Sequence, residues 1–399
     1  MNLKSLILAT TLVVSSFSLY AENSSEQLRK TLTSVQYRIS AQADNPDSNQ
    51  LSGLDAWINK SEINWGNSDL DDFEDQKLSY EIQLKNREQI NTEQAILDLG
   101  RVKAQLKRSS YLDKKLQYRY ASFIDLLEQE KQQQLLQQKH ALVNSDLNHW
   151  KLKINSDTFR ADKLQQADLS LDQVWGEMLE NGGTLERLRN DPANIVVGNT
   201  LSIHQMLKIE QQILKSGEYQ QHNLRIQKAE MDIQLANNEQ QRHEAQQKLS
   251  LGSFKLEYDN KDDDFGVSVG IKMPVTKNSF DSLQEKQAVY YANLDAKNTR
   301  FEIEDQLREK QNLLYQLQHQ WLSSQQVLQK MNTRIKRLST STNIDLLLDL
   351  KAQRLDVLKR QNRVSVQALR QYISFLNTAG MLSAKPYRNW LLKGTPQLF

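Results

Sequence analysis

The 399-residue sequence contains no cysteine, five prolines and 13 glycines. A chain without cysteine has no disulfide scaffold, no thiolate metal site and no thiol nucleophile. Its 51 basic and 49 acidic residues nearly balance and form no basic block, so we expect no nucleic-acid partner. The mean hydropathy of −0.68 excludes a protein built from several apolar membrane-spanning helices.

The scarce prolines leave long stretches of chain without any, including 145 residues between Pro46 and Pro192. An interior proline costs a helix about 3 kcal/mol, so such stretches favour long helices. Heptad spacing supports the same conclusion within residues 301–338. Apolar side chains lie seven positions apart there, at Leu307, Leu314, Trp321, Leu328 and Ile335. This pattern predicts a coiled-coil seam between long antiparallel helices.

The first residues have the layout of a secretory signal. Lys4 precedes an apolar run from Leu6 to Val14, and small and polar residues follow as far as Ala21. The sequence after Ala21 is abruptly polar, which disfavours the alternative of a short buried helix. We therefore predict that residues 1–21 are a signal peptide and that the protein is exported.

Short segments with a period of two interrupt the helical pattern. Apolar residues occupy every second position from Leu78 to Leu84, from Phe254 to Tyr258 and from Val267 to Ile271. This alternation predicts strands with one apolar face. The first segment matches the third at an offset of 189 residues. We infer a unit of one β-hairpin and one long helical hairpin that occurs twice.

Clusters of Ser, Thr, Asn and Asp predict where the long helices turn, at 154–158 and 339–343. These turns and the strand segments divide the chain into parts. In chain order the predicted parts are a signal peptide (1–21), a short N-terminal helical segment (22–61), a first β-hairpin (62–85), a first helical hairpin (86–181), a linker (182–201), a return helix (202–250), a second β-hairpin (253–274), a second helical hairpin (278–380) and a C-terminal tail (381–399).

The apolar faces of the strands allow two interpretations. Strands of this length suit a transmembrane barrel, but the smallest barrels have about eight strands and open edges are not tolerated in lipid. In a membrane, several copies of the chain would therefore have to pool their hairpins. The alternative is a small soluble β-layer packed on the helices. The residues that would face lipid are Tyr80, Ile82, Leu84, Phe254, Leu256, Tyr258, Val267, Val269 and Ile271.

Three stretches resemble TolC-type outer-membrane efflux proteins. The strand that ends Lys272-Met273-Pro274 is similar to the strand and proline that precede a long helix in that family. The run from Asn343 to Leu355 is similar to the helix start after the family's periplasmic turn, and Leu376 to Gly380 matches its helix end. The resemblance covers about 62–380, and the duplicated strand–helix plan is its most specific feature.

The resemblance implies a mainly α protein with a small β part. Three chains would share a twelve-stranded β-barrel in the outer membrane and continue it as an α-helical tunnel through the periplasm. A periplasmic adaptor and an inner-membrane pump of RND or ABC type would dock on it. The implied function is a passive duct of a tripartite efflux or type I secretion system.

The resemblance also suggests where the tunnel would narrow. Alignment on Ala352-Gln353-Arg354 places the family's aperture aspartates at Leu348 and Lys351 of this sequence. Asp345 and Asp349 are offset from those positions but lie i,i+4 on one helix face. We take them as candidate aperture residues, with Asp157 as the first-half equivalent. The alternative is that they are solvated acids that stabilise the start of a helix.

The sequence offers no catalytic pattern. It has no phosphate-binding glycine loop and no Gly-x-Ser-x-Gly, and its six histidines show no i,i+4 pair. We expect no enzyme activity, cofactor or metal site. The alternative to a channel is a soluble periplasmic coiled-coil scaffold or adaptor that does not conduct.

Overall fold

The computed structural model describes residues 57–67, 76–191, 200–246, 248, 250–259, 264–272, 279–339, 343–386 and 388–392. The predicted signal peptide and residues 22–56 of the predicted N-terminal segment lie outside these residues. The described chain divides into two compact units. The first contains the described parts of Ser110–Asn223 and Ile303–Phe399, and the second contains the described parts of Ser40–Ser109 and Leu224–Glu302.

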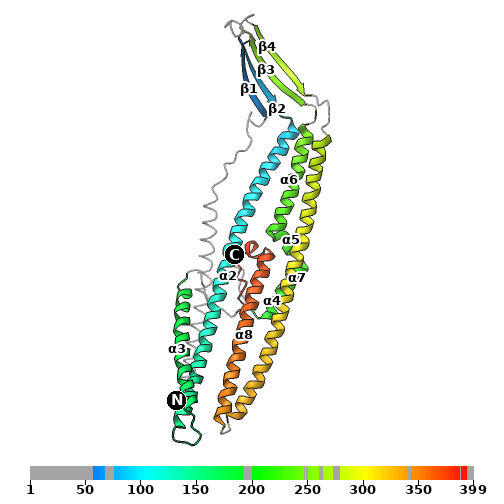
Figure 1. Cartoon of the computed structure of the whole chain (residues 1–399). Helices are drawn as coiled ribbons and strands as arrows, with labels where there is room; N and C mark the ends of the chain where they lie inside the picture. The colour runs from blue at the N-terminus through cyan, green and yellow to red at the C-terminus, as the bar shows by residue number, and fades with distance from the viewer. Residues whose placement is uncertain are drawn as a thin grey trace, which may run out of the picture. The chain divides into compact units, whose positions relative to one another are not determined.

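The second unit carries a four-stranded antiparallel sheet, with the strands side by side in chain order (Figure 1). Its strands are β1 (Ile58–Asn67), β2 (Gln76–Leu84), β3 (Ser250–Asp259) and β4 (Asp264–Lys272). β2 and β3 join the two halves of the sequence, and the register shifts at bulges near the starts of β1 and β3. The strand segments expected from the period of two are confirmed.

The described helices of both units are α2 (Arg87–Leu152), α3 (Ala161–Arg189), α4 (Ile203–Ser216), α5 (Glu218–His222), α6 (Leu224–Gln246), α7 (Ser279–Leu338), α8 (Ile344–Thr378) and α9 (Met381–Ala384). None of these helices carries an apolar run long enough to cross a membrane. The chain is mainly helical with a small antiparallel sheet, as the sequence predicts.

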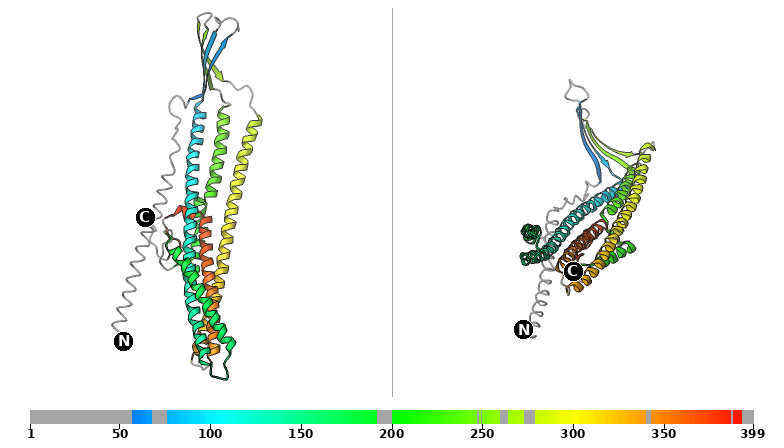
Figure 2. Two further views of the ribbon diagram at one scale, coloured as in Figure 1. Left: turned by 60° about the vertical axis from the view of Figure 1, so that its left-hand side comes forward. Right: turned by 60° about the horizontal axis from the view of Figure 1, so that its bottom comes forward.

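In the second unit, α6 lies between the first part of α2 and the first part of α7, as both views of Figure 2 show. Two polar contacts connect α6 to the helices on either side of it. Asn86, just before α2, donates a hydrogen bond of 2.6 Å from Nδ2 to the carbonyl oxygen of Ala245 on α6. On the other side of α6, His243 Nδ1 lies 3.4 Å from Glu285 Oε1 on α7.

In the first unit, the predicted heptad seam of α7 is buried at Leu307, Leu314 and Leu328. The densest part of the core lies along the second half of α8, where Tyr372 and Phe375 have no exposed surface. The chain after α9 closes this core. Leu391 is fully buried, and its carbonyl oxygen accepts a hydrogen bond of 2.8 Å from the N–H of Leu201.

Several predicted boundaries are wrong. The linker expected from residue 182 begins later, because α3 continues to Arg189. Asn181 is buried and donates hydrogen bonds to Gln129 and Gln133 on α2, so tertiary contacts hold the helix through Gly182 and Gly183.

The expected return helix at 202–250 is three helices, because Gly217 adopts a left-handed φ of 68° and Asn223 an extended backbone. The first hairpin starts at Ile58 instead of 62, so the end of the predicted N-terminal helical segment is strand. The second hairpin starts at Ser250 instead of 253, because the bulge between Leu251 and Ser253 interrupts the alternation without ending the strand.

Candidate functional site

The register of the sheet brings the candidate lipid-facing residues together on one face. Residues directly opposite each other in an antiparallel pair point to the same side. Tyr80 lies opposite Leu256 and Ile82 opposite Phe254, while Leu256 and Phe254 in turn lie opposite Val267 and Val269. Tyr258, Ile271 and Leu84 keep the same parity on their strands. Ile63, Leu78 and Phe265, which were not among the residues predicted to face lipid, extend this face.

The apolar face is most exposed on the two outer strands. On β4, Val267, Val269 and Ile271 are 56%, 58% and 70% exposed, and on β1 Ile63 is 72% exposed. Tyr80, Ile82 and Leu84 on β2 are partly covered, as are Phe254 and Leu256 on β3. A β-branched or aromatic face of this size is unusual for a surface that meets water. The predicted apolar face is thus partly exposed in this chain, and whether lipid covers it stays a prediction.

The opposite face of the sheet is polar. Cross-strand rows on it contain Lys60 and Gln83, then Glu62 with Glu81 and Lys255, then Ser79 with Glu257. Lys255 Nζ pairs with Glu257 at 3.1 Å, and Lys60 pairs with Glu62. The sheet thus separates apolar and charged side chains completely in its central rows.

Both edges of the sheet are free within the described strands. β1 pairs with β2 alone and β4 pairs with β3 alone. Each edge is about nine residues long and carries apolar side chains next to unpaired backbone groups. Natural sheets usually block such edges against pairing with another chain. Here neither edge has a proline or an inward charge on the apolar face to do so.

The first unit places the candidate aperture residue Asp345 beside the end of α2. Its Oδ1 lies 2.7 Å from Nε2 of His149, and Lys153 Nζ lies 3.2 Å from its Oδ2. Burial acts to raise the pKa of Asp345, but the hydrogen bonds from Lys153 and His149 outweigh it and lower the pKa. Asp345 is therefore a paired carboxylate that joins α8 to α2.

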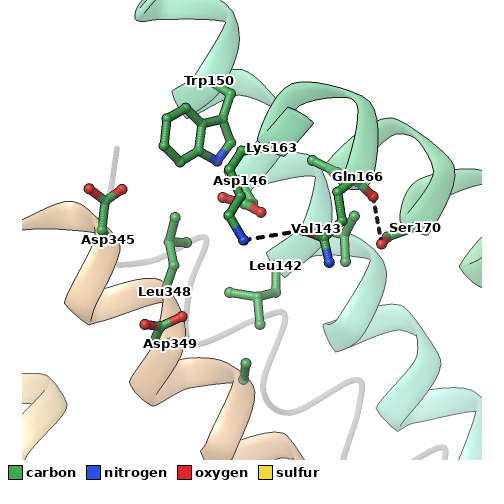
Figure 3. A pocket seen from close by; sticks show the side chains of 12 residues that line it. Leu142, Val143, Asp146, Trp150, Lys163, Gln166, Ser170, Asp345, Leu348 and Asp349 are labelled. Carbon is green, nitrogen blue, oxygen red and sulfur yellow. Dashed lines mark hydrogen bonds between the residues drawn. The ribbon is translucent and has the colours of Figure 1, made fainter. Parts of the chain in front are cut away.

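Asp349, the second candidate, lies one turn further along α8 and lines a hollow of about 380 Å³. Figure 3 shows Asp345, Leu348 and Asp349 of α8 on one side of it and Asp146 and Trp150 of α2 on the other. The pKa of Asp146 is raised, first by burial and further by the carboxylates of Asp345 and Asp349, against the hydrogen bond from Trp150. The structure thus groups three carboxylates where the sequence predicted two.

Asp157, the third candidate, is exposed in the turn between α2 and α3 and is not among the residues that line the hollow. The sequence prediction missed Asp146, His149 and Lys153. They lie about 190 residues from Asp345 in the chain, so no local spacing could connect them. The sequence did contain one indication that these residues lie close together. The predicted turns at 154–158 and 339–343 occupy equivalent places in the two helical hairpins, so the helix ends beside them were expected at the same end of the structure. Within the described ranges, no three His, Asp or Glu side chains are grouped as metal ligands would be.

No protein-family model and no curated protein sequence matches the chain. Solved structures match its fold. The outer membrane protein VceC from Vibrio cholerae is similar with a TM-score of 0.55 and 11% identity over 92% of this chain and 96% of that chain. The Campylobacter jejuni CmeC outer membrane channel gives a TM-score of 0.53 and 10% identity over 90% of this chain and 83% of that chain. The resemblance seen in the sequence is confirmed at the level of architecture: the chain has the fold of the TolC-like outer-membrane channels.

Proposed function

We propose that the chain is one subunit of a passive outer-membrane channel. The observation that carries the proposal is the four-stranded sheet, whose apolar face is exposed and whose two edges are unpaired within the described strands. The likeness of the fold to outer-membrane channels supports it. The sheet would contribute to a shared β-barrel, and the long polar helices would continue the wall of the duct.

Strand number favours three copies. In lipid every backbone polar group must be paired, so β1 of one chain would pair with β4 of the next until the sheet closes. Two copies would give eight strands, and side chains fill the interior of a barrel of that size. Three copies give twelve strands and leave a lumen lined by the polar face. A homotrimer would therefore pair the backbone groups of both sheet edges and leave an open pore.

The remaining parts of the proposal rest on the family resemblance. The trimer would stand in the outer membrane and extend into the periplasm, where an adaptor and an inner-membrane pump of RND or ABC type would supply substrate and energy. Efflux and one-step protein secretion both fit such a duct. Asp345, Asp349 and Asp157 are proposed to lie near its periplasmic mouth, with Asp146 added by the geometry of the hollow.

Adjacent residues of β4 allow a matched test. Val269 lies on the apolar face and Ser268 on the polar face. In a barrel, Val269→Arg places a charge in lipid at a cost of about 2–4 kcal/mol per chain, whereas Ser268→Arg faces water. We expect the wild type and Ser268→Arg to fractionate with outer membranes and to migrate as heat-sensitive trimers. Val269→Arg should be absent from the outer-membrane fraction and should form no such trimer.

The soluble-scaffold alternative gives the opposite result. An arginine on a water-exposed sheet face has little effect on stability, so Val269→Arg would behave like Ser268→Arg. Recovery of all three proteins as soluble monomers after osmotic shock would contradict the channel proposal.

A further inference from the structure

The polar face of the sheet has an uneven distribution of charge along the strands. Taking the cross-strand partners as rows, Glu62, Glu81, Lys255 and Ser268 form one row with a net charge of −1. The next row towards the hairpin loops, Asn64, Ser79, Glu257 and Gly266, also carries −1.

The pattern continues in both directions. The last complete row before the loops contains Gly66, Lys77, Asp259 and Asp264 and again carries −1. The row on the other side, nearer the helices, contains Lys60, Gln83, Ser253 and Gly270 and carries +1. The polar face is therefore acidic over three rows and basic in the fourth.

Ion pairs within the chain neutralise most of these charges locally. Lys77 Nζ lies 2.7 Å from Asp259, Lys255 pairs with Glu257, and Lys60 pairs with Glu62. Glu81 is different: no ion pair or hydrogen bond of its side chain is formed with the residues that the structure describes. Lys255 lies directly opposite Glu81 on β3, but the ion pair of Lys255 is with Glu257, which leaves Glu81 without an ion-pair partner in its own row.

Glu81 also lies directly opposite Glu62 on the neighbouring strand. Like charges in directly opposite positions destabilise a sheet, so this pairing works against folding. In a channel lumen the two neighbouring carboxylates would have a function, because rings of acidic side chains make a pore prefer cations. In contrast, Asp345 in the first unit already has an ion-pair partner in Lys153.

We propose that Glu81, with Glu62 beside it, is the main determinant of cation preference in the sheet-lined part of the channel. This proposal rests on the proposed function, because it requires that the polar face line a water-filled lumen. In a trimer Glu81 would form a ring of three carboxylates. The preferred solutes of this part of the duct would be cations and solutes with a cationic group.

The test is the reversal potential of purified trimer in a planar bilayer under a KCl gradient. Three charges about 10 Å from the pore axis change the ratio of cation to anion permeability about fivefold at 0.1 M salt. We expect Glu81→Gln to lower the ratio by about this factor and Lys255→Gln, in the same row, to raise it. At 1 M salt, where the Debye length is about 3 Å, both shifts should largely vanish.

A conducting Glu81→Gln trimer with the wild-type permeability ratio at low salt would overturn the proposal and leave the channel function intact. If Glu81→Gln fails to assemble, Lys255→Gln carries the test, and an unchanged ratio in that variant would overturn the proposal equally. Absence of conductance in the wild type would instead overturn the channel function, and this inference with it.

Discussion

At the scale of single residues, Glu210 on α4 shows how the helical unit depends on pH. It is fully buried, and its two carboxyl oxygens have no hydrogen-bond partner among the described residues. Burial raises the pKa of Glu210 to about 9. The carboxyl group is therefore protonated in the folded chain at neutral pH, within the buried part of the first unit.

The sign of the effect follows from the pKa of an unfolded glutamate, about 4.3. Between that value and about 9 the folded chain holds a proton that the unfolded chain has lost. The free energy of unfolding therefore falls as the pH rises, by at most about 1.4 kcal/mol per pH unit. Glu210→Gln resembles the protonated group and removes this dependence. We expect the thermal midpoint of the wild type to fall more between pH 6 and pH 8.5 than that of the variant.

Glu309→Gln on the exposed surface of α7 is the matched control and should follow the wild type. Equal pH dependence in the wild type and Glu210→Gln would contradict a buried neutral Glu210. The sequence carried a signal for this residue. Glu210 continues the apolar stripe of α4 formed by Ile203, Met206 and Ile213, and a carboxyl group on such a stripe is expected to be buried.

At the scale of elements, Gly380 fixes the end of α8 against the junction of α5 and α6. Its φ is 73°, and a Cβ at this position would lie 2.2 Å from the carbonyl oxygen of His222. Gly217 has a similar φ of 68° but nothing within 4 Å of such a Cβ. Alanine substitutions at the two glycines therefore distinguish the cost of backbone strain alone from the cost of strain plus steric overlap.

Gly217→Ala should cost about 1–2 kcal/mol, the strain of a left-handed alanine. Gly380→Ala should cost clearly more, because the backbone of His222 must also move. Thermal unfolding of the two variants measures the difference. Equal losses of stability would show that the close approach of Gly380 to His222 does not exist in solution.

These elements also show what the sequence could predict. The helix end before Gly380, the turns before Ala161 and Ile344 and the strand alternation were all predictable, because local chemistry determines them. The passage of α3 through Gly182 and Gly183 was not, because it depends on hydrogen bonds from Asn181 to a helix about 50 residues earlier. The pairing of Asp345 with His149 and Lys153 could not be predicted from the sequence either, because it also joins residues far apart in the chain.

At the scale of the whole molecule, the low mean hydropathy of the sequence is compatible with the exposed apolar face of the sheet. Each strand is half polar, so four strands add little to the hydropathy of a long, polar helical chain. The fold was predictable because the strand–helix unit occurs twice. The proposed trimer rests on the number of strands and on the family resemblance, and the proposed function depends on it.

The most direct measurement of the proposed channel function is the conductance of the purified full chain in a planar bilayer. We expect discrete, stable current steps from a heat-sensitive wild-type trimer, and none from Val269→Arg, because the arginine disfavours insertion of the sheet into lipid. Folded wild-type protein that stays monomeric and never conducts would show that the chain is not a channel subunit.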